Sequence, residues 1–352
     1  MNKRIITMIF TTFIVTAGLL SSCSSTKEEK RTLLTGISVF LEGQEVSALF
    51  DDGEALWVGG KDGIKLLDNS SGETLAHLDA QIKMVYASDI CRTADGTIWA
   101  GHNSGLTAFS PEGEMLLSLS KPELPGGRIN TLLPDGDGLW VGAMEGAAYL
   151  SPENGNWVVK ETLNSQNGLA DDCVNVMLRL GKELWFGAYL ATEKGGLSIR
   201  RDTGEWQYLS VDEGLPHRYV NALWQLSENR LLVGVGHLNI GGLAMVEKRD
   251  GSWAVTETWS YDDGIPGEKV RWLFGDSAGR VWITTESCGI LLCPSVSALE
   301  VPLLDGLLIT RDNGLSDNEV KTIVECEDCL WLGSRSGLTR VEKSSINGWF
   351  RN

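Results

Sequence analysis

Two glycine-bounded segments contain most of the side chains that could recognise a small ligand. Each segment, 187–195 and 234–241, begins at the last residue of a Leu-x-hydrophobic-Gly motif. Together they supply an aromatic ring, a carboxylate, an ammonium group, an imidazole and an amide, on Tyr189, Glu193, Lys194, His237 and Asn239. A tyrosine ring beside an imidazole can stack on a sugar ring, and the polar groups can hydrogen-bond its hydroxyls. The alternative interpretation is that these are ordinary solvated loop residues.

Equivalent turns elsewhere in the chain supply four further candidates, His102, Asn103, Glu286 and Arg335. His102, His237 and Glu286 are residue types that can hold a catalytic metal, so metal-dependent lyase or hydrolase chemistry stays open as an alternative. No nucleophile elbow and no phosphate-binding loop occurs in the sequence. We therefore assign no catalytic residue, and a binding role is favoured over an enzymatic one.

Metal and disulfide chemistry have weak support. Asp135 and Asp137 resemble the start of a calcium loop, but the acidic residue that would complete it is missing. A structural or channel Ca²⁺ stays open, and no other cofactor is predicted. Two cysteine pairs, Cys288 with Cys293 and Cys326 with Cys329, fall in different repeats, which disfavours a shared zinc site. Half-buried thiols are the favoured interpretation, with a disulfide as the alternative.

A sequence repeat determines where these residues must lie. The motif Leu-Trp-hydrophobic-Gly, or a close variant, occurs seven times, with its second residue 41 to 50 positions from the next copy. The second residues are Trp57, Trp99, Trp140, Trp185, Leu232, Trp282 and Trp331. Each copy begins with a strand led by a hydrophobic residue, continues through a turn into the motif, and then has a Gly-led strand. Several copies add a fourth strand.

Four antiparallel strands repeated seven times predict an all-β protein, a seven-bladed β-propeller with little helix. The tryptophans should pack between neighbouring blades. The last copy supplies only three clear strands, so we expect the N-terminal segment 33–41 to complete it and close the ring. Trp349 and Phe350 compete for that place.

A second set of candidates follows the leading hydrophobic residue of each innermost strand. These residues are Ser47, Ser88, Asn130, Asn175, Asn221, Arg271 and Lys321, and the register is ambiguous only in the second copy. Innermost strands line a propeller's channel, so these side chains should surround the channel mouth. They could contact a ligand there, or they could satisfy buried backbone groups and channel water.

The linkers between copies carry a family resemblance. Segments such as Asn167-Gly168-Leu169 and Asn313-Gly314-Leu315 run into strands led by valine, and the whole unit resembles the two-component regulator propeller repeat over about residues 36–345. That repeat occurs in extracellular sensor regions that respond to oligosaccharides. The resemblance implies a binding module, here without the kinase and DNA-binding regions of those sensors. Propellers of one fold host many functions, so the resemblance is stronger evidence for the fold than for the function.

The first 33 residues predict where in the cell the protein is located. Residues 1–22 have a basic start and an apolar core, and read as a signal peptide. The sequence Leu20-Ser21-Ser22-Cys23 resembles a bacterial lipobox, which implies that Cys23 is lipidated. Residues 23–33 would then be a flexible tether, and residues 34–352 the propeller. Ser24 favours the outer membrane, facing either the periplasm or the cell surface.

Charge narrows the choice of partners. The chain has 352 residues and a formal net charge of −17, and this acidity argues against nucleic acid as a partner. Its four histidines limit His-based metal or acid–base chemistry without excluding it. We therefore expect a monomeric, lipid-anchored module that binds a carbohydrate, or an extracytoplasmic protein, on its loop face. A protein–protein assembly scaffold without a small ligand is the alternative.

Overall fold

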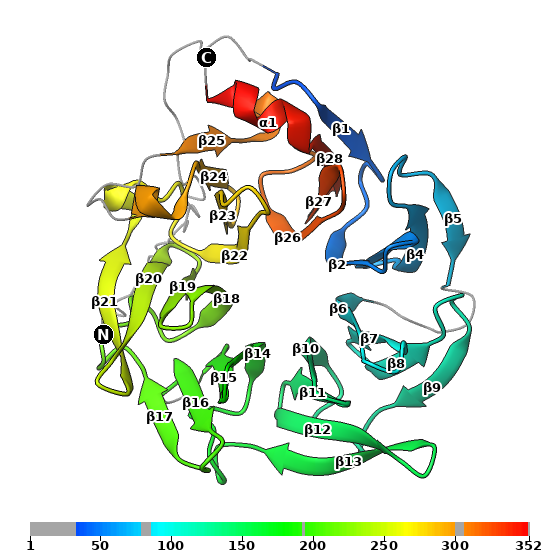
Figure 1. The fold of residues 1–352 in the computed structure, drawn as a ribbon, viewed down its shortest axis with the longest axis vertical. Coiled ribbons are helices and arrows are strands. Elements are labelled where there is room, and N and C mark those ends of the chain that lie inside the picture. The colour runs from blue at the N-terminus through cyan, green and yellow to red at the C-terminus, as the bar shows by residue number, and fades with distance from the viewer. Residues whose placement is uncertain (1–32, 79–85, 192–193, 300–305, 351–352) are drawn as a thin grey trace, which may run out of the picture. The chain divides into compact units, whose positions relative to one another are not determined.

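The structure is a ring of seven four-stranded antiparallel sheets (Figure 1). This computed structural model describes residues 33–78, 86–191, 194–299 and 306–350. In six sheets the strands pair in chain order, and the seventh takes its outermost strand from the N-terminal end. The predicted seven-bladed β-propeller is therefore confirmed. The predicted signal peptide and Cys23 lie outside the described residues.

Blades 1 to 4 follow one another along the chain, each beginning with its innermost strand. Blade 1 consists of β2 (Val46–Asp51), β3 (Ala55–Gly60), β4 (Gly63–Asp68) and β5 (Thr74–His77). Blade 2 consists of β6 (Ala87–Arg92), β7 (Ile98–His102), β8 (Gly105–Phe109) and β9 (Met115–Leu119). Blade 3 consists of β10 (Ile129–Asp135), β11 (Gly138–Ala143), β12 (Gly146–Glu153) and β13 (Asn156–Leu163). Blade 4 consists of β14 (Val174–Leu180), β15 (Glu183–Ala188), β16 (Leu197–Arg201) and β17 (Trp206–Leu209).

Blades 5 to 7 complete the ring, and the helical turns of the described residues lie among them. Blade 5 consists of β18 (Val220–Ser227), β19 (Arg230–His237), β20 (Ile240–Arg249) and β21 (Ser252–Trp259). Blade 6 consists of β22 (Val270–Gly275), β23 (Val281–Thr285), β24 (Gly289–Cys293) and β25 (Leu307–Ile309). Blade 7 consists of β26 (Val320–Glu325), β27 (Cys329–Ser334), β28 (Gly337–Glu342) and β1 (Ile37–Phe40). The helical elements are η2 (Tyr261–Asp263), η3 (Val296–Leu299), η4 (Arg311–Asn313) and α1 (Lys343–Trp349).

The repeated tryptophans pack between blades, as the sequence predicts. Trp99 of blade 2 meets Trp157 of blade 3 at a ring-centroid distance of 4.9 Å, and Trp185 of blade 4 meets Trp253 of blade 5 at 4.8 Å. Leu232, the one copy without tryptophan, lies in an apolar cluster with residues of blade 6. Each sheet therefore buries its faces against its neighbours in the ring, where large aromatic side chains contribute most of the buried area.

Several indole nitrogens are fixed by the turn that precedes them. Trp57 Nε1 donates to Asp52 at 2.7 Å, and Trp282 Nε1 donates to Asp276 at 3.0 Å. Asp52 and Asp276 also accept hydrogen bonds from backbone N–H groups of their own hairpin turns. The aspartate at the start of the hairpin turn thus shapes the turn and orients the tryptophan that follows it.

The N-terminal strand closes the ring. β1 pairs with β28, with Ile37 opposite Val341 and Phe40 opposite Leu338. The competing prediction, that Trp349 and Phe350 supply this strand, is wrong, because Trp349 ends α1. There it is buried, and its Nε1 donates to the Thr35 carbonyl at 3.1 Å. In the described part of the chain, no helix has the length and hydropathy that a membrane span requires.

Replacing Trp349 tests this closure. Trp349→Ala removes a buried indole and its bond to the N-terminal segment, so we expect a loss of about 3–5 kcal/mol in unfolding free energy. Phe350→Ala is the control, because Phe350 is 40% exposed and should change stability by less than about 0.5 kcal/mol. Urea unfolding measures both. Equal, small losses would mean that α1 contributes nothing to closing the ring.

Candidate functional site

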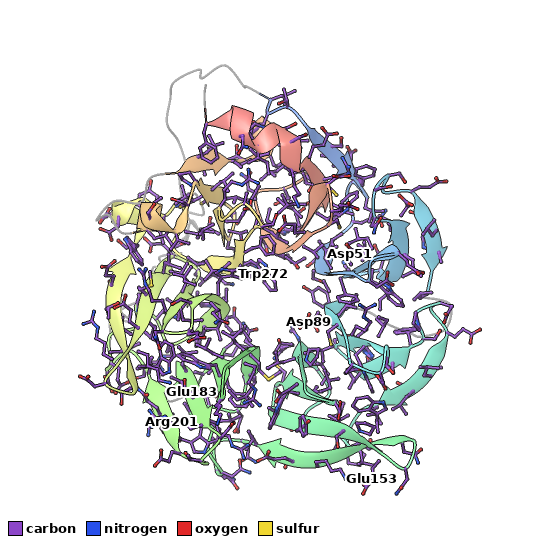
Figure 2. The ribbon with its side chains drawn as sticks, in the orientation of Figure 1. Asp51, Asp89, Glu153, Glu183, Arg201 and Trp272 are labelled. Carbon is purple, nitrogen blue, oxygen red and sulfur yellow. The ribbon has the colours of Figure 1, made fainter. Side chains whose placement is uncertain are left out.

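The channel contains a cavity of about 430 Å³ at its centre. Its wall includes all seven polar residues that the sequence places after the leading residue of each innermost strand. Each innermost strand has a β-bulge at that position, so the residue is left out of the strand ladder. The bulge turns its side chain toward the channel and the neighbouring blade. Figure 2 shows Trp272, another wall residue, at the edge of the central opening.

Five of these seven side chains bind the next blade. Each donates to the carbonyl of the first residue in the following innermost strand. Asn130 donates to Val174 at 2.9 Å and Asn175 to Val220 at 3.1 Å, while Ser47, Ser88 and Asn221 make the same bond to Ala87, Ile129 and Val270. We call these five residues the inter-blade belt. Their hydrogen bonds favour the interpretation that they satisfy buried backbone groups.

A second ring consists of the residue directly before the first residue of each innermost strand, and we call it the mouth ring. Its members are Glu45, Tyr86, Arg128, Cys173, Tyr219, Lys269 and Glu319. In every blade, the carbonyl of the mouth-ring residue accepts a backbone N–H from the end of the second strand or from the turn that follows it, at 2.9 to 3.4 Å. The donors are Lys61, Asn103, Met144, Tyr189, Gly236, Glu286 and Arg335. The segment before each innermost strand and the end of the second strand are therefore joined at the mouth.

The part of the mouth formed by blades 6, 7 and 1 is filled by ion pairs. Lys269 contacts Glu286, Arg271 lies 3.5 Å from Glu286, and Lys321 contacts Glu45. Glu319 lies 3.7 Å from Arg271 and 3.5 Å from Lys321. The predicted candidates Glu286, Arg271 and Lys321 thus belong to one network of ion pairs, in which Glu319 links Arg271 to Lys321.

The electrostatics of this part favour the charged state of Glu286. Burial alone would raise the pKa of Glu286, but the ion pairs with Lys269 and Arg271 outweigh it and hold the pKa below its ordinary value. Arg335 is 68% exposed at the rim and lies 3.8 Å from Glu319. A ligand that bound here would have to break existing charge pairs, which disfavours this part of the mouth as a binding surface.

Blades 4 and 5 contribute four rings, Tyr189, His217, Tyr219 and His237, which we call the aromatic cluster. Tyr219 is central, with ring-centroid distances of 5.0 Å to Tyr189, 4.8 Å to His217 and 5.4 Å to His237. The Tyr189 hydroxyl lies 3.4 Å from His237 Nδ1 and 3.4 Å from Lys269 Nζ. Burial, followed by the charges of His237 and Arg218, lowers the pKa of His217, which favours its neutral form. The structure therefore brings together the predicted pair Tyr189 and His237.

The remaining candidates do not join this cluster. His102 is 3% exposed, its Nε2 lies 3.0 Å from the Thr107 hydroxyl, and burial lowers its pKa to about 4. Lys194, Asn239 and Asn103 are exposed loop residues, and Glu193 lies outside the described residues. Within the described ranges, no three His, Cys, Asp or Glu side chains are grouped as a metal would require. Cys91, Cys173, Cys326 and Cys329 are free thiols.

Sequence reasoning missed the mouth ring, although the signal was present. The same alignment that identified the residue after each leading hydrophobic residue also identifies the residue before it. Read at that position, the chain gives charged residues at Glu45, Lys269 and Glu319, and aromatic residues at Tyr86 and Tyr219. The uneven distribution of charge and aromatic rings around the mouth could therefore have been predicted.

Known structures share this fold at low sequence identity. The extracellular domain of the hybrid two component system BT3049 from B. thetaiotaomicron aligns with a TM-score of 0.72 and 17% identity, over 89% of this chain and 42% of that one. PorZ, a bacterial surface component of the type-IX secretion system of Porphyromonas gingivalis, aligns with a TM-score of 0.64 and 16% identity, over 86% of this chain and 47% of PorZ. This chain therefore spans less than half the length of either protein.

An enzyme also has this architecture. Virginiamycin B lyase from Staphylococcus aureus aligns with a TM-score of 0.64 and 12% identity, over 87% of this chain and 98% of the lyase. The sequence matches no protein-family model and no curated protein. The comparisons therefore define the class of protein, a seven-bladed propeller whose structural neighbours include extracellular sensor domains.

Asp89 gives a testable property of the channel wall. It lies on β6 beside the central opening (Figure 2) and accepts the Leu132 N–H of blade 3 at 2.7 Å. Burial raises the pKa of Asp89 from 3.8 to about 6, despite the hydrogen bonds that it accepts. Protonation of Asp89 therefore stabilises the folded state, and this contribution is lost as the pH rises through about 6.

Asp89→Asn removes that titration. The stability of the wild type relative to Asp89→Asn should fall by about 1 kcal/mol between about pH 5 and about pH 7.5. Taking the difference between the two proteins cancels the titration of other carboxylates. Urea unfolding at both pH values measures it. A constant difference would contradict the raised pKa.

Proposed function

We propose that this chain is a non-catalytic, extracytoplasmic binding module that holds a carbohydrate at its channel mouth. The observation that carries this proposal is the aromatic cluster, which lies at the edge of the channel cavity. Tyr189 of this cluster forms part of the cavity wall. The cavity volume of about 430 Å³ falls within the range of small-ligand sites. The ion-paired part of the mouth offers fewer free groups, so the ligand belongs on the aromatic side.

The chemistry of the cluster suits a sugar. A pyranose presents C–H groups on one face and hydroxyls around its edge. The rings of Tyr189 and Tyr219 can pack against the apolar face, while the Tyr189 hydroxyl, His237 and Lys269 offer hydrogen bonds to the edge. Tyr189 is held by its backbone bond to Cys173 at 2.9 Å and by its neighbours, which lowers the entropic cost of binding.

We further propose that the chain is a bacterial lipoprotein of the two-component regulator propeller repeat family. Lipidated Cys23 would hold the propeller at the outer membrane, facing the periplasm or the cell surface. The extracellular placement of the BT3049 domain and the surface location of PorZ support an address outside the cytoplasm. We propose that the module is a monomer and binds no nucleic acid.

A partner protein is the second candidate ligand, and one observation favours it. Three apolar side chains next to the aromatic cluster are exposed: Leu190 by 45%, Leu238 by 69% and Ile240 by 64%. Leu190 and Leu238 have φ values of +50° and +51°, in the left-handed region that non-glycine residues rarely adopt. A protein surface could cover these loop tips. For the lyase alternative, His102 is buried and Glu286 is ion-paired, so no described group of residues supports it.

Thermal unfolding with a panel of oligosaccharides tests the carbohydrate proposal. A ligand at about 100 times its Kd should add about 2.7 kcal/mol of stability, which is visible as a rise in Tm. Tyr189→Ala and His237→Ala should each abolish the rise. Tyr261→Ala is the matched control, because Tyr261 is 58% exposed and lies on η2, outside the cluster.

Three results would count against the carbohydrate proposal. A rise that survives both cluster variants would place the site elsewhere. A rise with Ca²⁺ alone, reversed by chelator, would support the metal-dependent alternative. If no oligosaccharide raises Tm and the purified chain captures a membrane or surface protein through Leu238 and Ile240, a role as a protein–protein scaffold replaces the carbohydrate proposal.

The lipid anchor has a separate test. The wild-type chain, expressed in a bacterium that processes lipoproteins, should sediment with the membrane fraction, because several acyl chains together give stable anchoring. Cys23→Ser should move the chain to the soluble fraction. Cys288→Ser, which changes a partly buried cysteine in blade 6, should leave it in the membrane. Membrane retention of Cys23→Ser would contradict lipidation at this residue.

A further inference from the structure

The channel cavity has a charge balance opposite to that of the whole protein. The chain carries a formal net charge of −17, yet the described residues that line the cavity include three cations and no carboxylate. The three cations are Arg128, Arg271 and Lys321. An acidic chain that gathers only positive side chains around its main cavity favours an anionic ligand group there.

Two of the three cations are already neutralised. Arg271 lies near Glu286 and Glu319, and Lys321 contacts Glu45 and lies near Glu319. These carboxylates hold their cations at the wall and leave little net charge to attract a ligand. Arg271 and Lys321 therefore serve the closure of the channel between blades 6, 7 and 1, where the inter-blade belt is interrupted.

Arg128 differs from both. Its guanidinium lies 5.9 Å from the centre of the Tyr86 ring, and no carboxylate among the described residues pairs with it. Arg128 is exposed, so a ligand can reach its guanidinium from solvent. The Tyr86 ring offers it a cation–π contact, and a ligand anion would add charge-assisted hydrogen bonds. Arg128 is therefore a cation of the cavity wall that is available to a ligand.

Arg128 and one ring of the aromatic cluster line the same cavity. Arg128 and Tyr189 both line it, and so does Cys173, which follows Arg128 in the mouth ring. The Cys173 carbonyl accepts the Tyr189 N–H, and the charge of Arg128 acts on the Cys173 thiol. A single ligand of a few sugar units can therefore contact the cluster with one end and Arg128 with the other.

We propose that the ligand is an acidic saccharide, and that Arg128 binds its carboxylate or sulfate group. This inference rests on the carbohydrate-binding function proposed above and specifies its ligand class. The planar guanidinium can donate two parallel hydrogen bonds to either anion, which a lysine cannot do. Because Arg271 and Lys321 across the channel are already ion-paired, the anionic group of the ligand would bind at Arg128. That contact would fix the orientation of the ligand in the site.

Matched saccharide pairs separate charge from shape. One pair is a galacturonic acid oligosaccharide and its methyl ester, and the other is a heparin-derived oligosaccharide and its desulfated form. Calorimetric titration of the full chain near physiological salt should show that at least one acidic member binds at least about 10-fold more tightly than its neutral partner. The pair that shows this preference identifies the anion as carboxylate or sulfate.

Substitutions at Arg128 locate the preference. Arg128→Gln should weaken binding of the acidic member by about 10-fold or more, and leave the affinity for its neutral partner within about twofold. Arg128→Lys keeps the positive charge but cannot donate two parallel hydrogen bonds, so it should keep part of the preference for the acidic member. This variant also serves as a control for a folding defect in Arg128→Gln. Arg335→Gln, at an exposed arginine of the rim, is the control and should change neither affinity.

The outcomes distinguish this inference from the function on which it rests. If the acidic and neutral members bind equally well, or if Arg128→Gln weakens both equally, the acidic class is wrong while carbohydrate binding stands. If acidic members bind but Arg128→Gln has no effect, the anion site is not Arg128. If no saccharide of either kind binds, or changes Tm, both proposals fail.

Discussion

The structure depends on one constraint: a blade cannot bury both its faces alone, so every blade needs a neighbour on each side. Each motif tryptophan lies in an interface with the next blade, and at Leu232 other apolar side chains fill the same place. Inside this apolar layer, the inter-blade belt repeats one hydrogen bond from blade 1 to blade 6. Stability is therefore shared around the ring, and the ring must close for any blade to be fully packed.

The arrangement of side chains at the channel mouth follows from the inter-blade belt. In five blades the bulged residue donates to the carbonyl of the next blade. The residue before each innermost strand is held by its own carbonyl, while its side chain stays free to vary. That freedom produces ion pairs on one side, around Lys269 and Glu319, and aromatic rings on the other, around Tyr219. Tyr189 joins the two, because its hydroxyl lies near both His237 and Lys269.

The sequence was sufficient for the fold and for part of the site. Strict repetition of Leu-Trp-hydrophobic-Gly sets the number of blades, and alternating turns set the strands, so local pattern and global closure agree. Tyr189 and His237 could be paired because two long turns occur in adjacent copies. The burial of His102 could not be predicted, because it depends on how the turn of blade 2 packs, and the pairing of Glu286 with Lys269 joins residues whose contact requires the folded loops.

The closing strand also determines how the protein would respond to mechanical force. β1 is the outermost strand of blade 7, and it is held by four residue pairs with β28 and by the bond from Trp349 to Thr35 (Figure 1). Tension applied through the N-terminal end would load this short strand before any other. The ring would then open first where β1 pairs with β28, at its outer edge and away from the aromatic cluster. A pull on the N-terminal end is thereby converted into opening of blade 7, while the mouth formed by blades 2 to 5 is loaded last.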